Sequence, residues 1–305
     1  LNRLEYVGSA TNLPGFDLVF GVDLEEEING SLSRDNDGIY IEFLSDFSDN
    51  FFVTAGLRRD ENDDFGSHNS YRLSSAYLFS LSDAEIKLKG SYGSGFRAPS
   101  LFEIDYNNGP FSFPPAAGLK LVEEHSTGVE YGIEYLAGSV SLELVRFDQE
   151  VEDAIFFDLA GFSGYLQDTG TSSSEGVELS GTVSVSESLS LTANYTHNET
   201  ERPNGMQRLR RPEQLGNIGI NFTNSSEKFR LNAYYRVSRD SVDEQFGTAV
   251  ELDDFEVLDV SASYQISANV LLYARLENAL NESYQEIVDF ISPDRASYIG
   301  IRLNF

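Results

Sequence analysis

The sequence predicts an all-β protein, an antiparallel up-and-down transmembrane β-barrel. Apolar residues recur at every second position, and short turns alternate with longer polar connections along the chain. Many of the alternating segments run about ten residues, near the ~9–11 that a tilted membrane-spanning strand needs and above the ~5–6 of globular strands. A β-sandwich with Greek-key crossings would not alternate its connections in this way.

The period-two pattern is clearest near the end of the chain, where Ile299, Ile301 and Leu303 alternate with Gly300 and Arg302. On the other face of each such segment stand Ser, Thr, Asn, Gly or charged residues. The pattern predicts about fifteen strands. In chain order they are 1–7, 16–28, 37–46, 50–60, 70–81, 84–96, 122–136, 139–157, 163–185, 188–199, 213–223, 228–239, 252–266, 269–279 and 296–305.

The connections are expected to separate into two rims of the barrel. Short turns are predicted at Ser48-Asp49, Ser82-Asp83, Ala137-Gly138, Ser186-Glu187, 224–226 and Ser267-Ala268. Longer polar links are predicted at 29–36, 61–69, 97–121, 200–212, 240–251 and 280–295. The link at 158–162 is shorter than this rule predicts, and the link at 8–15 is longer. A short helical or irregular piece is expected between Ala98 and Tyr106.

The phase of the alternation also predicts a polar interior. Charged side chains fall on the polar face, at Lys87, Lys89, Glu143, Glu178, Asp259, Arg275, Glu277 and Arg302. A Lys or Arg facing lipid near the midplane would cost about 2–4 kcal/mol, so these positions suit a water-filled lumen or a wall that faces other protein.

Composition excludes several classes of function. The chain has 21 basic and 50 acidic residues and a net charge of −29, which argues against a nucleic-acid partner. Without cysteine there is no disulfide, thiolate metal site or cysteine nucleophile. The three histidines, His68, His125 and His197, lie far apart in sequence, so we expect no histidine metal cluster. No apolar stretch approaches the ~18 residues of a membrane-spanning helix.

No motif predicts catalysis, a cofactor or a metal. A Gly-x-Ser-x-Gly nucleophile elbow and a phosphate-binding Gly-rich loop are both missing from the sequence. The run from Asp35 to Gly38 resembles half a calcium loop, and Glu61, Asp63 and Asp64 form a second acidic group. Calcium takes 6–8 oxygen ligands, which neither stretch supplies, so both are expected to be solvated acidic loops.

Several segments in a fixed order carry a family resemblance. They read GSYGSGFRAPSLFEIDY at 90–106, LKLVEEHSTGVEYGIEY at 119–135, VSLELVRFDQEVEDAIFF at 140–157, SSSEGVELSG at 172–181, LRRPEQ at 209–214, LYARLENALNESYQE at 272–286 and RASYIGIRLNF at 295–305. Together they resemble the TonB-dependent outer-membrane receptors of Gram-negative bacteria, and most closely their cobalamin and siderophore branch. Two alternatives stay open: a passive porin or structural outer-membrane barrel, and an outer-membrane enzyme with a Ser/His or Asp/His site at its mouth.

The resemblance implies a barrel of about 22 strands around an N-terminal plug. Residues 1–305 would be one barrel domain holding the last fifteen strands, with the plug, the TonB box and the first strands absent from it. The implied function is TonB-dependent uptake of a scarce nutrient such as a ferric siderophore or cobalamin. The implied partners are outer-membrane lipid, the protein's own plug, the TonB complex and a small-molecule ligand. Phe305 matches the aromatic residue that closes such barrels.

The same resemblance places the connections 97–121, 200–212, 240–251 and 280–295 outside the cell. Candidate ligand contacts on these connections are Arg97, Tyr106, Phe111 and Phe113. Candidates for binding an anionic ligand or lipopolysaccharide phosphate are Arg208, Arg210 and Arg211. In the structural alternatives, Arg97 only terminates a strand before Pro99, the aromatics pack the loop onto its neighbours, and the arginines pair with nearby carboxylates.

Overall fold

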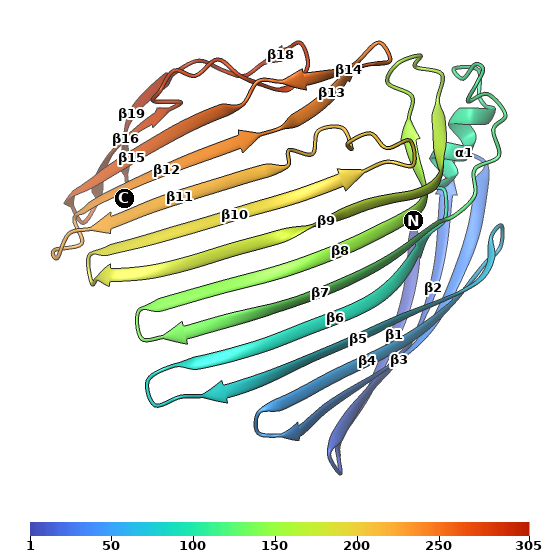
Figure 1. The fold of residues 1–305 in the computed structure, drawn as a ribbon, viewed down its shortest axis with the longest axis horizontal. Helices are drawn as coiled ribbons and strands as arrows, with labels where there is room; N and C mark the ends of the chain where they lie inside the picture. The colour runs from blue at the N-terminus through green and yellow to red at the C-terminus, as the bar shows by residue number, and fades with distance from the viewer. Residues whose placement is uncertain (305) are drawn as a thin grey trace.

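One antiparallel sheet of 15 strands, connected in sequence order, makes up most of the molecule (Figure 1). The computed structural model describes residues 1–304; Phe305, expected to close the barrel, lies outside the described residues. The sheet curves strongly, as a barrel wall does, and β1 and β19 are the two ends of its order (Figure 1). The predicted all-β, up-and-down antiparallel arrangement is confirmed.

The strands of this sheet have the following bounds: β1 Asn2–Leu13, β2 Phe16–Asn29, β3 Leu32–Ser48, β4 Phe51–Asn62, β5 Gly66–Ser80, β6 Glu85–Arg97, β7 Glu124–Ala137, β8 Val140–Phe157, β9 Tyr165–Ser186, β10 Leu189–Glu201, β11 Gln214–Thr223, β12 Phe229–Arg239, β15 Phe255–Ser267, β16 Val270–Glu277 and β19 Ala296–Leu303. Each overlaps one of the fifteen predicted strands. Two small hairpins stand apart from the sheet, β13 Ser241–Gln245 with β14 Thr248–Leu252 and β17 Gln285–Ile287 with β18 Phe290–Ile291.

The two rims differ as predicted, although three expected links are mostly strand. The rim with connections 98–123, 158–164, 202–213, 240–254 and 278–295, here called the loop rim, carries the helix and both hairpins (Figure 1). The expected links 29–36, 61–69 and 8–15 are mostly strand. Only Gly30 and Ser31 separate β2 from β3, only 63–65 separate β4 from β5, and β1 runs to Leu13. Ladder hydrogen bonds do not need apolar side chains, so the strands continue through polar residues beyond the alternating segment.

The first acidic stretch is therefore not the solvated loop that the sequence predicts, whereas Asp63 and Asp64 of the second lie in the exposed turn between β4 and β5. The run from Asp35 to Gly38 lies inside β3, with Asp35 opposite Glu26 and Asp37 opposite Leu24. Extended backbone points successive side chains to opposite faces, which disperses the carboxylates that a calcium loop would converge on one point.

The only helix among the described residues, α1 (Leu101–Asn108), begins where the sequence predicts a helical piece. Ser100 is its N-cap: the Ser100 hydroxyl accepts the N–H of Glu103 at 3.2 Å, and the Glu103 carboxylate accepts the N–H of Ser100 at 2.7 Å. This capping box satisfies two otherwise unpaired donors of the first turn. Among residues 1–304, no helix has the length and apolar character needed to cross a membrane.

Large apolar side chains cover the outer face of the sheet and are open to the surroundings. Ile218, Ile299 and Ile301 are 54%, 82% and 63% exposed. They continue across strands, for example where Leu272 stands opposite Ile301 and Ile220 opposite Leu191. A continuous exposed apolar surface of this kind marks contact with a partner or a membrane.

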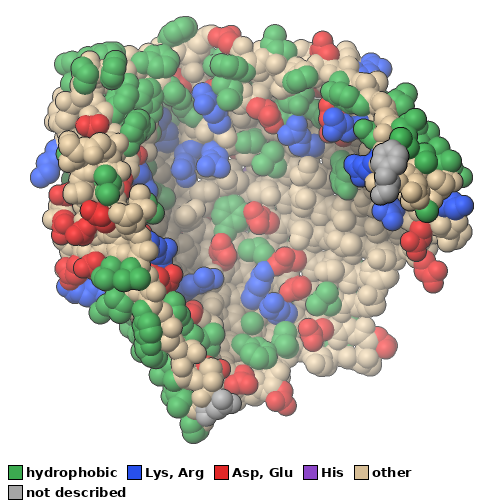
Figure 2. Space-filling model, turned by 180° about the vertical axis from the view of Figure 1, so that it is seen from behind, with side chains coloured by type: hydrophobic (Ala, Val, Ile, Leu, Met, Phe, Trp, Pro, Cys, Tyr) green, Lys and Arg blue, Asp and Glu red, His purple; other side chains and the backbone are tan. Residues whose placement is uncertain are grey.

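The concave face is polar. Figure 2 shows acidic and basic side chains distributed over it among uncharged polar groups. Lys89 pairs with Glu143, and Lys87 lies 3.4 Å from Glu134, which are the inward charges expected from the alternation. Asn217 donates to the side-chain oxygen of Asn194 at 2.8 Å across the β10–β11 pair. The sheet therefore has one apolar face and one wet face, as the wall of a water-filled barrel does.

Gly176, in the Gly-x-Glu segment of β9, has no room for a larger side chain. A methyl group on Gly176 would lie 2.0 Å from the carbonyl oxygen of His197 and 3.0 Å from the Cα of Asn198, its partner on β10. Backbone atoms cannot rotate away, so Gly176→Ala is expected to force β9 and β10 apart and to cost about 1–3 kcal/mol. Thermal unfolding of the intact protein in detergent measures this loss.

Gly128→Ala is the matched control on β7, where the nearest atom to an added methyl group is 3.8 Å away. It is expected to leave the unfolding temperature close to that of the parent. Equal unfolding temperatures for the two variants would contradict the tight β9–β10 contact.

Candidate functional site

The long connection 98–123 is anchored to the loop rim by a buried asparagine. The side chain of Asn107, 1% exposed, donates to the carbonyl of Tyr165 at 2.8 Å and accepts the N–H of Tyr165 at 2.9 Å. The amide thus pairs with the backbone at the start of β9 as a neighbouring strand would. This contact places α1 and the segment that follows it over the mouth of the curved sheet (Figure 1).

Arg97 joins three elements at this rim. Its guanidinium donates to both carboxylate oxygens of Glu124 at 2.6 and 2.9 Å, and to Glu103 at 3.1 and 3.2 Å. The side chain therefore connects the end of β6, the start of β7 and the first turn of α1. These contacts fit the structural alternative for Arg97, and ligand contact by Arg97 stays a prediction.

The three candidate aromatics occupy two kinds of environment. Tyr106 packs edge-on against Phe157 and Tyr165, with ring centroids 5.7 Å apart in both cases. Phe111 and Phe113, in contrast, are 76% and 48% exposed. Tyr106 thus packs the loop onto its neighbours, whereas the two phenylalanine side chains are exposed, and ligand contact by all three stays a prediction.

Arginine side chains converge on a cavity at the loop rim, here called the arginine pocket. Its volume is about 510 Å³, and its walls come from the ends of β8 and β9, the β10–β11 connection and the β13–β14 hairpin. The three predicted arginines, Arg208, Arg210 and Arg211, all line it. Arg202, which the sequence analysis did not single out, is a fourth. Arg202 stands six residues before Arg208, and the fold of the connection brings its side chain to the same pocket as the other three arginines.

Two of the four guanidinium groups are neutralised by carboxylates. Arg202 donates to both oxygens of Asp168 at 2.9 and 3.0 Å and lies 5.0 Å from the ring centroid of Phe156. Arg210 lies 2.9 Å from an oxygen of Asp243. These contacts match the structural alternative, in which arginines pair with neighbouring acids.

The other two arginines leave positive charge in the pocket. Within residues 1–304, neither Arg208 nor Arg211 has an acidic group within ion-pair distance. Burial, and then the charge of Arg211, lower the pKa of Arg208, although Glu124 opposes them. Glu244 also lines the pocket, whereas Asp158 accepts hydrogen bonds within its own loop from Gly161 and Ser163. Two guanidinium groups thus face one unengaged carboxylate.

Asp243 fixes the outer wall of the arginine pocket. Its side chain is fully buried, accepts the N–H of Val288 at 2.8 Å and pairs with Arg210. Burial favours the neutral acid, but hydrogen bonds from the backbone of Val288 and Glu244 and from Arg210 outweigh it and lower the pKa of Asp243. The carboxylate therefore stays charged at neutral pH and connects the β13–β14 hairpin to the 278–295 connection.

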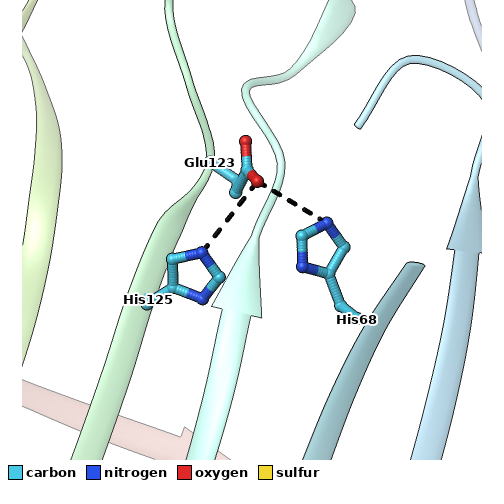
Figure 3. Close-up of side chains that lie close together, drawn as sticks. All are labelled: His68, Glu123 and His125. Atoms are coloured by element: carbon cyan, nitrogen blue, oxygen red, sulfur yellow. Dashed lines mark ion pairs between the residues drawn. The ribbon is translucent and has the colours of Figure 1, made fainter. Parts of the chain in front are cut away.

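The structure brings two of the histidines together, although the sequence predicts no histidine metal cluster. His68 at the start of β5 and His125 at the start of β7 both face Glu123, which precedes β7 (Figure 3). One ligand atom from each of the three lies within 4.8 Å of the other two. They meet because β5 and β7 are both neighbours of β6, so that the same ends of both strands lie at the loop rim. His197 remains apart, 3.1 Å from Glu199 on β10.

Comparison with protein families and known proteins identifies the fold. Residues 2–279 match the family model described as TonB dependent receptor-like, beta-barrel. Two vitamin B12 transporters, from Vibrio cholerae serotype O1 and Vibrio vulnificus, are 23% and 24% identical over 84% and 93% of this chain. The ferric enterobactin receptor of Pseudomonas aeruginosa in complex with enterobactin superimposes with a TM-score of 0.79 at 17% identity, over 99% of this chain and 54% of that one.

The alignments span only part of the related proteins. The matched region is 40% of the Vibrio cholerae transporter and 46% of the Vibrio vulnificus transporter. The relatives are named as transporters and receptors rather than enzymes.

Proposed function

Because this chain belongs to the TonB-dependent receptor β-barrel family and is therefore an outer-membrane protein of Gram-negative bacteria, we propose that it forms the barrel wall of a receptor for active uptake of a large, scarce nutrient. In this proposal the loop rim faces the medium and captures the ligand. A plug domain and the TonB complex, outside residues 1–305, couple capture to transport. Outer-membrane lipid covers the exposed apolar face.

The arginine pocket indicates that the ligand is anionic. It lies at the rim where the long connections meet, and two of its guanidinium groups have no acidic partner among the described residues. Guanidinium groups bind carboxylate and phenolate oxygens through directed, charge-assisted hydrogen bonds. An anionic metal chelate such as a ferric siderophore fits this chemistry, and the exposed Phe111 and Phe113 add apolar contact area.

Cobalamin is the second candidate ligand, because the curated relatives are vitamin B12 transporters. Cobalamin is large and carries only one phosphate, so it would depend on the loop aromatics more than on the arginines. The affinity for each ligand class therefore separates the two candidates.

The test is uptake by cells that produce the intact protein as their only receptor of this kind. We expect accumulation of radiolabelled ferric siderophore or cobalamin that is lost when TonB is deleted, because diffusion through a barrel alone cannot concentrate a solute. Uptake that is unchanged without TonB, together with free passage of small sugars, would instead support a passive porin.

A further inference from the structure

We propose that His68, Glu123 and His125 form a binding site for a divalent transition-metal ion of the zinc class at the loop rim. The site is separate from the arginine pocket, whose lining contains none of the three residues. The inference does not depend on the identity of the transported ligand. If it fails, the proposed uptake function is unaffected.

The distances are close to those that such an ion requires. The Nε2 of His68 lies 3.8 Å from Oε1 of Glu123, and the Nε2 of His125 lies 4.0 Å from the same oxygen (Figure 3). With metal–ligand bonds of about 2.0–2.1 Å in a tetrahedral site, neighbouring ligand atoms stand about 3.3–3.4 Å apart. Each nitrogen must therefore approach the Glu123 oxygen by roughly half an ångström. The two histidine nitrogens, which lie within 4.8 Å of each other, must close by at most about 1.5 Å, and rotations about χ angles supply both shifts.

The site is positioned by paired strands. His125 stands opposite Phe96 in the β6–β7 pair, and His68 stands opposite Asp60 in the β4–β5 pair. The ring of His68 also stacks on Phe96, with centroids 4.1 Å apart and an interplanar angle of 17°. Two of the three ligands therefore come from paired strands, and the packed ring of His68 loses little side-chain entropy when an ion binds.

Exposure leaves a place for a further ligand. The side chains of His68, Glu123 and His125 are 10%, 25% and 48% exposed, so the cluster is partly buried on one side and open to water on the other. Three protein ligands and a water molecule complete the usual four-coordinate zinc shell. Calcium and magnesium bind oxygen ligands almost exclusively and do not suit two imidazoles.

Binding of a metal ion would break one hydrogen bond of His68. The Nε2 of His68 also lies 3.0 Å from the carbonyl oxygen of Phe65, a distance at which the ring N–H donates to that carbonyl. A metal at Nε2 replaces this hydrogen bond, so the ion requires the imidazole tautomer with its proton on Nδ1. Without a metal, His68 is a packed ring with a local hydrogen bond, and this is the alternative that the experiment has to exclude.

A bound ion would join two parts of the loop rim. Glu123 and His125 stand where the 98–123 connection returns to the sheet, and His68 lies two strands away on β5. The coordination bonds would hold the end of this connection against β5 across β6. The consequence is a restrained loop that carries Phe111 and Phe113 in a fixed place over the mouth.

The test is calorimetric titration of zinc chloride into the intact protein, purified in detergent and stripped of metal. We expect one ion per molecule, and cobalt in its place giving the visible absorption of a four-coordinate site. His125→Ala and Glu123→Gln should each weaken zinc binding by about 100-fold or more, at least as much as the loss of an outer-shell partner. The matched control is His197→Ala, because the one ion pair that His197 makes among residues 1–304 is with Glu199, and this variant should bind zinc as the parent does.

His68→Phe separates coordination from packing. It keeps an aromatic ring to stack on Phe96 but removes the nitrogen ligand, so it is expected to assemble normally and to lose zinc binding. Hydrogen exchange should slow in residues 98–123 when zinc is added to the parent protein and stay unchanged in His68→Phe. The proposal is overturned if the parent binds no zinc, or if His68→Phe and His125→Ala bind it with parental affinity.

Discussion

Ile218→Lys is expected to lower the stability of the folded barrel strongly, whereas Asn217→Lys is expected to be tolerated. Ile218 is 54% exposed on the outer face at the middle of β11, opposite Ala193 on β10. A lysine facing lipid near the bilayer midplane costs about 2–4 kcal/mol, and the cost falls toward the interfaces. The measurement is the free energy of unfolding by urea of the protein folded into lipid vesicles.

Asn217→Lys is matched in depth, charge and size. Asn217 is the adjacent residue on the same strand, but its side chain lies on the polar face and donates to Asn194. A lysine there reaches water, so only the loss of one hydrogen bond, about 1 kcal/mol, is expected. If both variants lose the same stability, the two faces of β11 do not differ in environment.

Removal of two arginines of the arginine pocket, Arg208 and Arg211, is expected to weaken ligand binding. The double substitution Arg208→Ala and Arg211→Ala is expected to weaken binding of an anionic ferric siderophore by about 100-fold or more, since each charge-assisted hydrogen bond contributes about 1.5–3 kcal/mol. The measurement is quenching of intrinsic fluorescence as the ligand is titrated into the intact protein in detergent.

Arg230→Ala is the control for this experiment. Arg230 is an exposed arginine on β12, near the opposite rim, and removing it changes the net charge without changing the pocket. It should leave the affinity unchanged. High salt should weaken ligand binding to the parent and to Arg230→Ala, and should have much less effect on the double variant, which lacks the two pocket charges that salt screens. Tight cobalamin binding that is indifferent to both arginines would move the ligand assignment from siderophore to cobalamin.

The strands could be predicted from the sequence because each strand of the wall has its own alternation of apolar and polar residues. Ile299, Ile301 and Leu303 alternate with polar residues whether or not the rest of the barrel is known, and membrane thickness sets the minimum length. The ends of the strands could not be predicted in the same way. Above the apolar band, as at Asp35 in β3, pairing depends on the neighbouring strand and not on residue type.

The loop rim was only partly predictable. The cluster Arg208, Arg210 and Arg211 lies within four residues and stands out in an acidic chain. The ion pair between Arg210 and Asp243, however, joins the cluster to a hairpin 33 residues away in the sequence. The loop helix was predictable because Ser100 and Glu103 form a local capping box.

The histidine cluster was missed because distance in sequence was taken as distance in space. In an up-and-down sheet, the starts of every second strand meet at the same rim, so the predicted strands 70–81 and 122–136 already brought His68 and His125 to one end. The stacking on Phe96 and the arrival of Glu123 depend on the actual registers and could not be read from the sequence.

The central claim is that the apolar face of this sheet contacts lipid and the polar face contacts water. The chain contains no cysteine, so single cysteines introduced along β11 can be spin-labelled one at a time, after replacement of any cysteine elsewhere in the intact protein. In lipid vesicles, labels at positions 218, 220 and 222 are expected to collide with oxygen dissolved in the bilayer, and labels at 217 and 221 with a water-soluble nickel complex. Loss of this period-two alternation, or shielding of positions 218, 220 and 222 from both reagents by a packed protein interior, would contradict the barrel-wall account.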